Sequence, residues 1–188
     1  MNERTNIFAD LETDRCALRQ VNAEDAAFIL RHFGSEEVCQ FLLDEERYTH
    51  IDHAHELIEC YADPDSKGHN RWMILNKDTG ERMGTCGFHG WDRRNLAAEI
   101  GYDLSPEYWG RGYMSEVLAT MLAFGFERMG LNRIQAIVYP DNERSALLLQ
   151  KFYFVREGVI RDKHLYLGQF YDHDCYSLLR REWTGSQQ

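Results

Sequence analysis

The chain reads AEIGYDLSPEYWGRGYMSE over residues 98–116. Its first residues alternate in character with a period of two, which predicts a β-strand over 97–104. Glycines follow at 110 and 112, and an amphipathic pattern that continues to about Arg128 predicts a long helix beginning at Gly112. A glycine-bearing loop that opens into a helix can present consecutive backbone N–H groups at the positive end of the helix dipole. The segment therefore predicts a cradle for a pyrophosphate group.

Two familiar phosphate loops do not fit this segment. A Walker loop requires Gly-Lys-Ser or Gly-Lys-Thr where the helix starts, and the segment has neither. A dinucleotide-binding fingerprint requires a third glycine three residues after Gly112, where Ser115 stands instead. Taken alone, the remaining Gly-x-Gly pair favours an ordinary turn before a core helix.

The flanking sequence predicts helices early in the chain and mostly strands afterwards. The expected helices cover about 22–32, 35–42, 51–61, 112–128 and 142–151, with a cap at Asn22 and Asp25 and a capping box at Thr49 and Asp52. The expected strands cover 16–21, 72–76, 82–89, 97–104, 134–138, 154–161 and 170–179, and residues 63–68 form a loop. This order predicts an α+β fold with a single mixed, mostly antiparallel central sheet of about seven strands flanked by helices. We expect one domain over residues 1–188, with its core at about 13–183.

Composition narrows the class of partner. The 188 residues include 21 basic and 31 acidic side chains, giving a formal charge of −10. This balance disfavours duplex nucleic acid, whose binding proteins are normally basic, and favours a cationic or amine-bearing partner. The five cysteines are scattered without a CxxC or CxxH pair, so we expect reduced thiols in a cytoplasmic protein. No signal-peptide run or membrane-spanning stretch is recognisable.

The eight histidines do not predict a metal site. His50, His53 and His55 cluster, but the second and third fall on opposite faces of the expected helix. We expect these three to be solvated or to face the acceptor. His164 and His173, in the closing hairpin, are interpreted as structural.

Several segments resemble one family, and they follow one another in that family's order. Trp109–Ser115 and its flanks resemble the acyl-CoA signature of the GNAT N-acetyltransferase superfamily, above all the branch that acetylates the N-terminal residues of ribosomal proteins. The further matching segments are Thr13–Arg19, Ala98–Tyr102, Arg133–Tyr153, Glu157–Asp162 and Gly168–Trp183. The resemblance spans about Thr13 to Trp183 and implies a GNAT-like fold.

The resemblance implies acetyl-CoA as the cosubstrate. Its pyrophosphate would bind backbone N–H groups of the loop residues Arg111, Gly112, Tyr113, Met114 and Ser115. The strand ending at Tyr102, Asp103 and Leu104 would splay from its neighbour at 134–138, and the pantetheine would hydrogen-bond to the exposed edge. A backbone N–H of that edge would also meet the developing oxyanion. The acceptor amine would approach from the other side of the splay.

Acetyl transfer requires an amine that has lost its proton, since an ammonium group is not a nucleophile. Glu99 is a carboxylate in a strand that is otherwise rich in small and apolar residues, which favours a base that acts through water or an anchor for the substrate. Glu107 and water alone are alternative bases. The plain structural alternative for Glu99 is a salt bridge to Arg93 or Arg94.

The leaving thiolate also requires a hydrogen-bond donor. Many members of the superfamily have a tyrosine seven residues after the asparagine that caps the following helix, but here that position is Leu149. In the ribosomal-protein branch, the resemblance implies that Asn142 caps the helix and contacts CoA, while Ser145 donates to the sulfur. Ordinary helix N-terminal chemistry is the alternative for both residues.

Two positions depart from the family pattern. Met114 stands where alanine or glycine is usual, so its side chain must point away from the phosphates. Tyr153 stands where glycine is usual, in a turn that favours a left-handed conformation. We expect either a different turn, or a Tyr153 side chain that reaches the CoA tail or a partner subunit.

The sequence thus predicts acetyl transfer from acetyl-CoA to a primary amine, with the N-terminal amine of a protein or peptide first. The alternatives are a small cationic acceptor, such as a polyamine, an amino acid or an antibiotic, and a non-catalytic acyl-CoA-binding module. The closing hairpin and the early helices offer two surfaces for a homodimer. Given the charge of −10, we expect the cofactor site to rely on backbone N–H groups and a helix end, with the surplus carboxylates facing a cationic acceptor.

Overall fold

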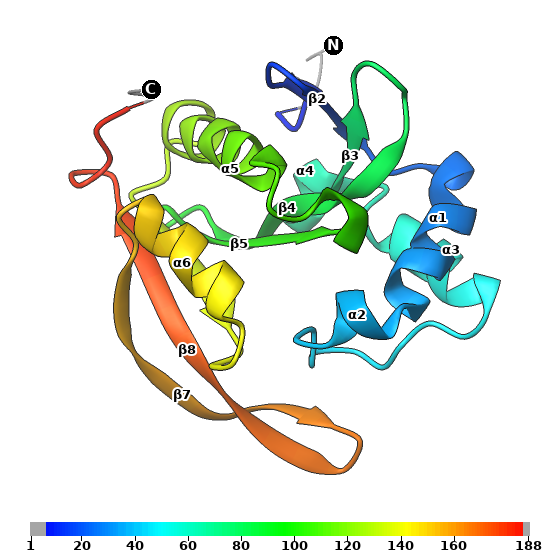
Figure 1. The fold of residues 1–188 in the computed structure, drawn as a ribbon. Helices are drawn as coiled ribbons and strands as arrows, with labels where there is room; N and C mark the ends of the chain where they lie inside the picture. Colours follow the sequence, from blue (N-terminus) through cyan, green and yellow to red (C-terminus); the bar gives the residue numbers. More distant parts are fainter. Residues whose placement is uncertain (1–6, 186–188) are drawn as a thin grey trace.

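The computed structural model describes residues 7–185, which form one eight-stranded sheet in the order β1-β2-β3-β4-β5-β6-β8-β7 (Figure 1). All neighbouring strands are antiparallel except β5 and β6, which run parallel. The predicted mixed, mostly antiparallel sheet is confirmed, with one short strand, β1, beyond the expected seven. The strands are β1 (Leu11–Glu12), β2 (Cys16–Gln20), β3 (Trp72–Asn76), β4 (Arg82–Asp92), β5 (Ala97–Leu104), β6 (Arg133–Val138), β7 (Val155–Tyr166) and β8 (Gln169–Leu179).

The helices group on two sides of this sheet (Figure 1). One group is α1 (Ala26–Gly34), α2 (Glu36–Cys39) and α3 (Ile51–Cys60), and the other is α5 (Tyr113–Ala123) and α6 (Glu143–Lys151). Shorter elements are η1 (Ala23–Asp25), α4 (Pro64–Lys67), η2 (Pro106–Tyr108) and η3 (Phe124–Arg128). Within residues 7–185, no helix combines the length and the apolar character needed to cross a bilayer.

Strand β3 shows why the sheet carries a core on each face. Trp72 and Ile74 pack into the main core with the buried side chains of α5, whereas Met73, between them, packs with α1 and α3. Adjacent side chains of a strand point to opposite faces, so the three consecutive buried residues of β3 require a cover on both faces of the sheet. The main core contains Leu18, Trp72, Phe88, Ile100, Leu118, Met121, Leu122, Ile134, Leu149 and Leu178, all buried.

The parallel pair of β5 and β6 is short, and this creates the site. The two strands are in register only at Ala97–Arg133, Ala98–Ile134 and Glu99–Gln135. Beyond this point β5 remains paired with β4 as far as Leu104, and β6 remains paired with β8 as far as Val138. Each strand therefore keeps its outer neighbour while the two part from each other, as the expected splay requires.

Several local predictions differ from the structure. The helix expected at 35–42 ends at Cys39, because the chain then turns to pass over the mouth of the cavity described below. The capping box expected at Thr49 is wrong: His50 is the N-cap of α3 and its side chain accepts from the Asp52 N–H at 3.4 Å. The loop expected at 63–68 contains the short helix α4, which begins at Pro64. The helix expected over 112–128 becomes a wider π-helix from Phe124 onward.

Tyr153 adopts the left-handed conformation that is usual for a glycine at this position, so the turn does not differ from the family pattern. Its φ is 64°, and its side chain is 73% exposed. Its N–H donates to the Gln150 carbonyl, and the N–H of Phe154 reaches back to the Leu149 carbonyl, which ends α6 in the manner of a helix C-cap. The backbone strain of a tyrosine at positive φ is therefore offset by satisfied carbonyl groups at the helix end.

The buried carboxylate of Asp25 joins three elements of the fold. It accepts two hydrogen bonds from Arg19 of β2, one from Arg82 of β4 and one from the Asn22 N–H, with donor–acceptor distances of 2.7–2.9 Å. Burial alone would raise the pKa of this carboxyl group. The two guanidinium groups and the Asn22 N–H outweigh that effect and hold the pKa below its ordinary value of 3.8.

We expect Asp25→Asn to lower the free energy of unfolding at neutral pH by about 3 kcal/mol, because it leaves two arginines without their buried counter-ion. A carboxyl group whose pKa is depressed by folding stabilises the protein above its unfolded pKa, and that contribution is lost as the pH falls through the folded pKa. The difference between wild type and variant should therefore be constant from neutral pH down to about 3.8 and then shrink. Urea unfolding across this pH range measures it, and a difference that persists at low pH would contradict the ion-pair explanation.

Candidate active site

The loop before α5 adopts the backbone that the two glycines permit. Gly110 has φ of 70° and Gly112, the N-cap of α5, has φ of 82°. Tyr113 and Met114 then occupy the first two helical positions, whose N–H groups have no acceptor within a helix. The Ser115 N–H differs from the expectation, since it donates to the Gly112 carbonyl at 3.1 Å. The N–H groups of Tyr113 and Met114, before Ser115, therefore remain available to a ligand.

Arg15, immediately before β2, fixes the orientation of this loop. Its Nη2 donates to the Arg111 carbonyl at 3.1 Å, and its Nε pairs with the Glu116 carboxylate at 2.5 Å. The guanidinium also lies 4.2 Å from the centre of the Tyr113 ring. Because a trans peptide unit is planar with its C=O and N–H opposed, a carbonyl held toward Arg15 directs the Gly112 N–H the other way. Sequence reasoning missed this role, since the contact joins residues about a hundred positions apart.

Further cationic side chains gather at the same loop. Arg144 of α6 lies 4.4 Å from the centre of the Trp109 ring, and Lys151 Nζ donates to Ser115 Oγ at 3.4 Å. Together with Arg15 and the exposed Arg111 they surround the N-terminus of α5. The expectation that this site relies on backbone N–H groups and a helix end did not include these cationic side chains. The Trp109 indole also donates to the Leu104 carbonyl at 2.6 Å, so this carbonyl already has a hydrogen-bond partner within the protein.

A cavity of about 790 Å³ occupies the space where β5 and β6 part. It reaches Tyr102, Asn142 and Ser145 on the side of α6, and Glu99 and Asp103 on the side of α1 and α3. Neighbouring side chains along β5 point to opposite faces, so one strand contributes to both sides. The cavity therefore passes through the sheet from one face to the other.

The α6 side of the cavity is built by the cap of that helix. Asn142 is the N-cap, and its Oδ1 accepts from the Ser145 N–H at 3.2 Å. The Ser145 hydroxyl lies 2.9 Å from the Tyr102 hydroxyl, and burial raises the pKa of Tyr102 to about 12. Leu149 is fully buried in the main core and has no access to the cavity. The three polar residues predicted from the sequence thus meet, with Tyr102 contributing its side chain.

Glu99 lies half-buried on the opposite side of the cavity. Its carboxylate accepts from Gln135 Nε2 at 3.3 Å, across the last residue pair of β5 and β6. His89 faces Glu99 across β4 and β5, and the Tyr61 hydroxyl lies 3.3 Å from His89 Nδ1. Burial, together with the positive charge of Arg71, lowers the pKa of His89 to about 3, so its imidazole is neutral at physiological pH. Sequence reasoning did not single out His89.

Asp103 was expected to contribute backbone atoms, but its side chain is the centre of a buried network. The carboxylate accepts from the Thr85 N–H at 2.8 Å, from Thr85 Oγ1 at 2.6 Å and from Arg71 at 3.4 Å, and it lies 2.7 Å from His32 Nε2. Burial opposes the charged form, yet these partners hold the pKa of Asp103 below its ordinary value. A carboxylate with its lone pairs occupied in this way anchors α1, β4, β5 and Arg71, which immediately precedes β3.

Ser105, His32 and Asp103 together have the composition of a hydrolase triad. The Ser105 hydroxyl lies 2.9 Å from His32 Nδ1, and the other ring nitrogen faces Asp103. Ser105 and His32 are buried, however, and neither lines the cavity. A nucleophile must reach its substrate, so the arrangement stabilises the junction of α1 and β5 and does not form a second reactive centre.

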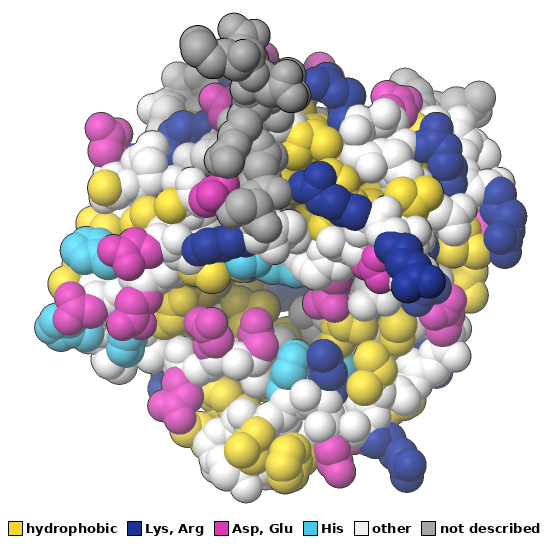
Figure 2. Space-filling model, turned by 180° about the vertical axis from the view of Figure 1, so that it is seen from behind, with side chains coloured by type: hydrophobic (Ala, Val, Ile, Leu, Met, Phe, Trp, Pro, Cys, Tyr) yellow, Lys and Arg dark blue, Asp and Glu magenta, His cyan; other side chains and the backbone are white. Residues whose placement is uncertain are grey.

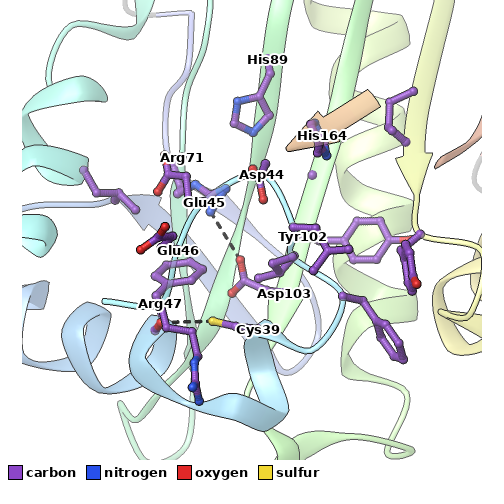
Figure 3. A pocket seen from close by; sticks show the side chains of 18 of the residues that line it. Cys39, Asp44, Glu45, Glu46, Arg47, Arg71, His89, Tyr102, Asp103 and His164 are labelled. Carbon is purple, nitrogen blue, oxygen red and sulfur yellow. Dashed lines mark hydrogen bonds and ion pairs between the residues drawn. The ribbon is translucent and has the colours of Figure 1, made fainter. Parts of the chain in front are cut away.

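The mouth of the cavity on the α1 and α3 side is acidic. Carboxylates of Asp44, Glu45, Glu46 and Glu56 line it, and the first three are exposed on the loop between α2 and α3. Figure 3 shows these loop carboxylates beside the labelled Arg71 and Asp103. Figure 2 shows a hollow on this face with acidic and histidine side chains gathered around it. Six carboxylates and two arginines (Asp44, Glu45, Glu46, Glu56, Glu99 and Asp103; Arg47 and Arg71) line the cavity as a whole.

The closing hairpin completes the wall. His164 and His173, from β7 and β8, both line the cavity, and their ring centres are 4.5 Å apart. Burial lowers the pKa of both imidazoles. Among residues 7–185, no three histidine, cysteine or acidic side chains are grouped as a metal ion would need. The two histidines, first interpreted as structural, thus also shape the cavity.

Two other residues from the sequence analysis take clear positions. Glu107 is exposed in η2 and does not line the cavity. Met114 packs against the main core, so its side chain turns away from the loop surface as expected. Of the two carboxylates considered as a base, only Glu99 faces the cavity.

Comparisons with known proteins show the family and the fold of this chain. A family model described as an acetyltransferase (GNAT) domain matches residues 15–155. The uncharacterized N-acetyltransferase p20 of Bacillus licheniformis is 38% identical over 176 residues, which cover 93% of this chain and 98% of that protein. The [ribosomal protein uS5]-alanine N-acetyltransferase of Escherichia coli is 30% identical over 112 residues, 59% of this chain and 58% of that protein. The solved spermidine N-acetyltransferase of Vibrio cholerae, in complex with CoA and spermine, has the same fold, with a TM-score of 0.78, 20% identity, and coverage of 89% of this chain and 97% of that one.

We expect Arg15→Met to weaken the binding of CoA about tenfold, because it removes both a positive charge and the hydrogen bond that orients the Arg111–Gly112 peptide. Isothermal titration with CoA measures the dissociation constant. Arg128→Met is the matched control, since it removes the same charge from the exposed far end of the same helical segment. Equal affinities in the two variants would show that Arg15 does not organise the loop.

Proposed function

The chain belongs to the GNAT acetyltransferase family and is an acetyl-CoA-dependent N-acetyltransferase, and from this premise we propose that its acceptor is the N-terminal amine of a protein or peptide. The observation that carries the proposal is the cavity between β5 and β6, which links the α6 side, near the loop, to an open acidic mouth. A donor and an acceptor that enter from opposite faces of a sheet can meet at such an opening. The catalytic domain extends over about residues 13–183.

The charge of the mouth supports a cationic acceptor. Asp103 and Arg71 offset each other inside the buried network, which leaves five carboxylates and Arg47 around the opening. An N-terminal ammonium, attracted there, must then lose its proton before it reacts. The [ribosomal protein uS5]-alanine N-acetyltransferase, whose name states an alanine of a protein as the acceptor, is similar over more than half of this chain and favours a protein acceptor.

A small cationic amine is the second candidate. The same carboxylates would attract a polyamine, and a protein with this fold is a spermidine N-acetyltransferase. The structural likeness to that protein, at 20% identity, supports the fold alone. We therefore propose a protein N-terminus as the first candidate acceptor and a small amine as the second.

In the proposed reaction Glu99 acts as the base through a water molecule. It is the carboxylate that lines the cavity next to the end of the β5–β6 pairing, where the two substrates would meet. Gln135 fixes one of its oxygens, and neutral His89 lies beside it as a further hydrogen-bonding group. Asp103 has its hydrogen-bonding capacity occupied, so it is poorly suited to accept a proton.

The residues near the loop would hold the donor. Backbone groups of Arg111, Gly112, Tyr113 and Met114 would bind the pyrophosphate, supported by the surrounding cations. The free edge of β5 near Tyr102 and Asp103 would hydrogen-bond to the pantetheine, with Asn142 and Ser145 placed at its reactive end. Acetyl-CoA supplies the activated acetyl group.

Thiol release from acetyl-CoA with a panel of amines tests the acceptor. We expect peptides with a free N-terminus and basic second and third residues to react fastest, ahead of spermidine, aminoglycosides and N-terminally blocked peptides. Fast turnover of spermidine with inert peptides would favour the second candidate. CoA binding without turnover on any amine would overturn the enzymatic assignment of the site.

We further expect Glu45→Gln with Glu46→Gln to raise the KM for a basic peptide severalfold, because two attractive charges at the mouth are removed, each worth up to about 1 kcal/mol. The KM for acetyl-CoA should be unchanged, and the effect should decline at high salt. Glu37→Gln with Glu127→Gln is the matched control, since both carboxylates are exposed and outside the cavity. A larger effect on neutral than on basic peptides would contradict the proposed attraction.

We expect Glu99→Gln to lower kcat about 100-fold, the scale on which a positioned base contributes, and to leave CoA affinity unchanged. Rates measured from pH 6 to 9 provide the check, because the defect should lessen at high pH, where the amine loses its proton without help. Glu107→Gln, at an exposed position off the cavity, is the control and should retain full activity. If Glu107→Gln lost activity while Glu99→Gln kept it, Glu107 would be the base instead of Glu99.

A further inference from the structure

Two hydroxyl groups meet where β5 and β6 part. Tyr102 comes from the β5 side of the opening, and Ser145 from the first turn of α6, which follows β6. Their oxygens are 2.9 Å apart, and both residues are half-buried in the wall of the cavity. This hydrogen bond thus joins side chains from the two sides of the opening.

The chemistry of the two groups decides which one donates. A phenol is far more acidic than an aliphatic alcohol and is therefore the better donor, so the Tyr102 hydrogen lies on Ser145 Oγ. The Asn142 side chain accepts the Ser145 backbone N–H and makes no hydrogen bond to the Ser145 hydroxyl. Ser145 Oγ has no other partner within residues 7–185. The hydrogen of Ser145 is then free to turn toward an acceptor in the cavity.

We propose that Tyr102 is a positioning residue that orients the Ser145 hydroxyl toward the sulfur of CoA. The inference rests on the proposed acetyl transfer. In that reaction the amine nitrogen bonds to the acetyl carbon, the carbon–sulfur bond breaks, and sulfur leaves with the electron pair while the amine proton passes to water. Ser145 donates a hydrogen bond to the resulting thiolate, which later takes a proton from solvent.

The environment supports a hydrogen bond and not proton loss from Tyr102. Burial raises the pKa of Tyr102 to about 12, well above that of an ordinary thiol, so a thiolate would not take its proton. Leu149 occupies the position where many members of the superfamily have a tyrosine, and it is fully buried. In the proposal, Ser145 donates to the sulfur, and Tyr102 of β5 orients the Ser145 hydroxyl from across the opening.

Tyr102→Phe tests the inference, because it removes the hydroxyl and keeps the ring that packs against the core. We expect kcat to fall about tenfold, as for loss of one hydrogen bond to a charged group, with the KM for acetyl-CoA within about twofold of wild type. Ser145→Ala should behave alike, and the double variant should be no slower than Ser145→Ala alone. Tyr108→Phe is the matched control, since its hydroxyl contacts Glu81 away from the cavity.

A second measurement does not require turnover. The thiol pKa of bound CoA, followed by the ultraviolet absorbance of the thiolate, should be higher by about one unit in Tyr102→Phe and in Ser145→Ala than in wild type. An unchanged thiol pKa in Tyr102→Phe, or single defects that multiply in the double variant, would overturn the inference. A raised thiol pKa in a protein that acetylates no amine would refute the proposed function and leave the positioning role intact.

Discussion

The site depends on a single interruption of hydrogen bonding, where the pairing of β5 with β6 stops after Glu99 and Gln135. Buried backbone N–H and C=O groups are almost always paired, so a strand edge left open inside a sheet is costly unless a ligand or water completes it. Both strands keep their outer neighbours to the end, which prevents the sheet from closing the gap by shifting. The same parting creates the cavity, places Tyr102 opposite Ser145, and leaves a free edge for an extended ligand.

The gap between β5 and β6 stays open because each of the two strands is fixed in place. On one side, the charge of Asp103 is buried among Thr85, His32 and Arg71, which locks β5 onto β4 and α1. Removing one partner of such a network leaves an uncompensated buried charge, so the end of β5 cannot readily move across the gap. On the other side, β6 is paired along its whole length with β8, and Arg133 pairs with Glu157 of β7. Because both strands are held rigidly, the sheet can keep an opening where β5 and β6 are not hydrogen-bonded to each other.

The sequence was informative where function follows from neighbouring residues, and less so where it follows from distant ones. The glycine loop, the strand before it and the Asn142 cap each depend on a few adjacent positions, and each was predicted. Arg15, His89 and the side chain of Asp103 act through residues far along the chain, which no local pattern reveals. The end of α2 was missed for a related reason, because its periodicity continues past the point where the chain turns over the cavity. Pairings of this kind become visible only when the register of the strands is known.

The distribution of charge reconciles an acidic protein with a polyanionic cosubstrate. The formal charge of the chain is −10, yet Arg111, Arg144 and Lys151 lie around the N-terminus of α5, together with Arg15, whose charge Glu116 offsets, while exposed carboxylates line the opposite mouth. Charges farther apart than about 8 Å are largely screened at physiological ionic strength, so each ligand responds to its local field and not to the net charge. The backbone donors and the helix dipole then act in the same direction as the nearby cations. An acidic surplus elsewhere therefore does not weaken the anion site, and it remains available to attract a cationic acceptor from the other face of the sheet.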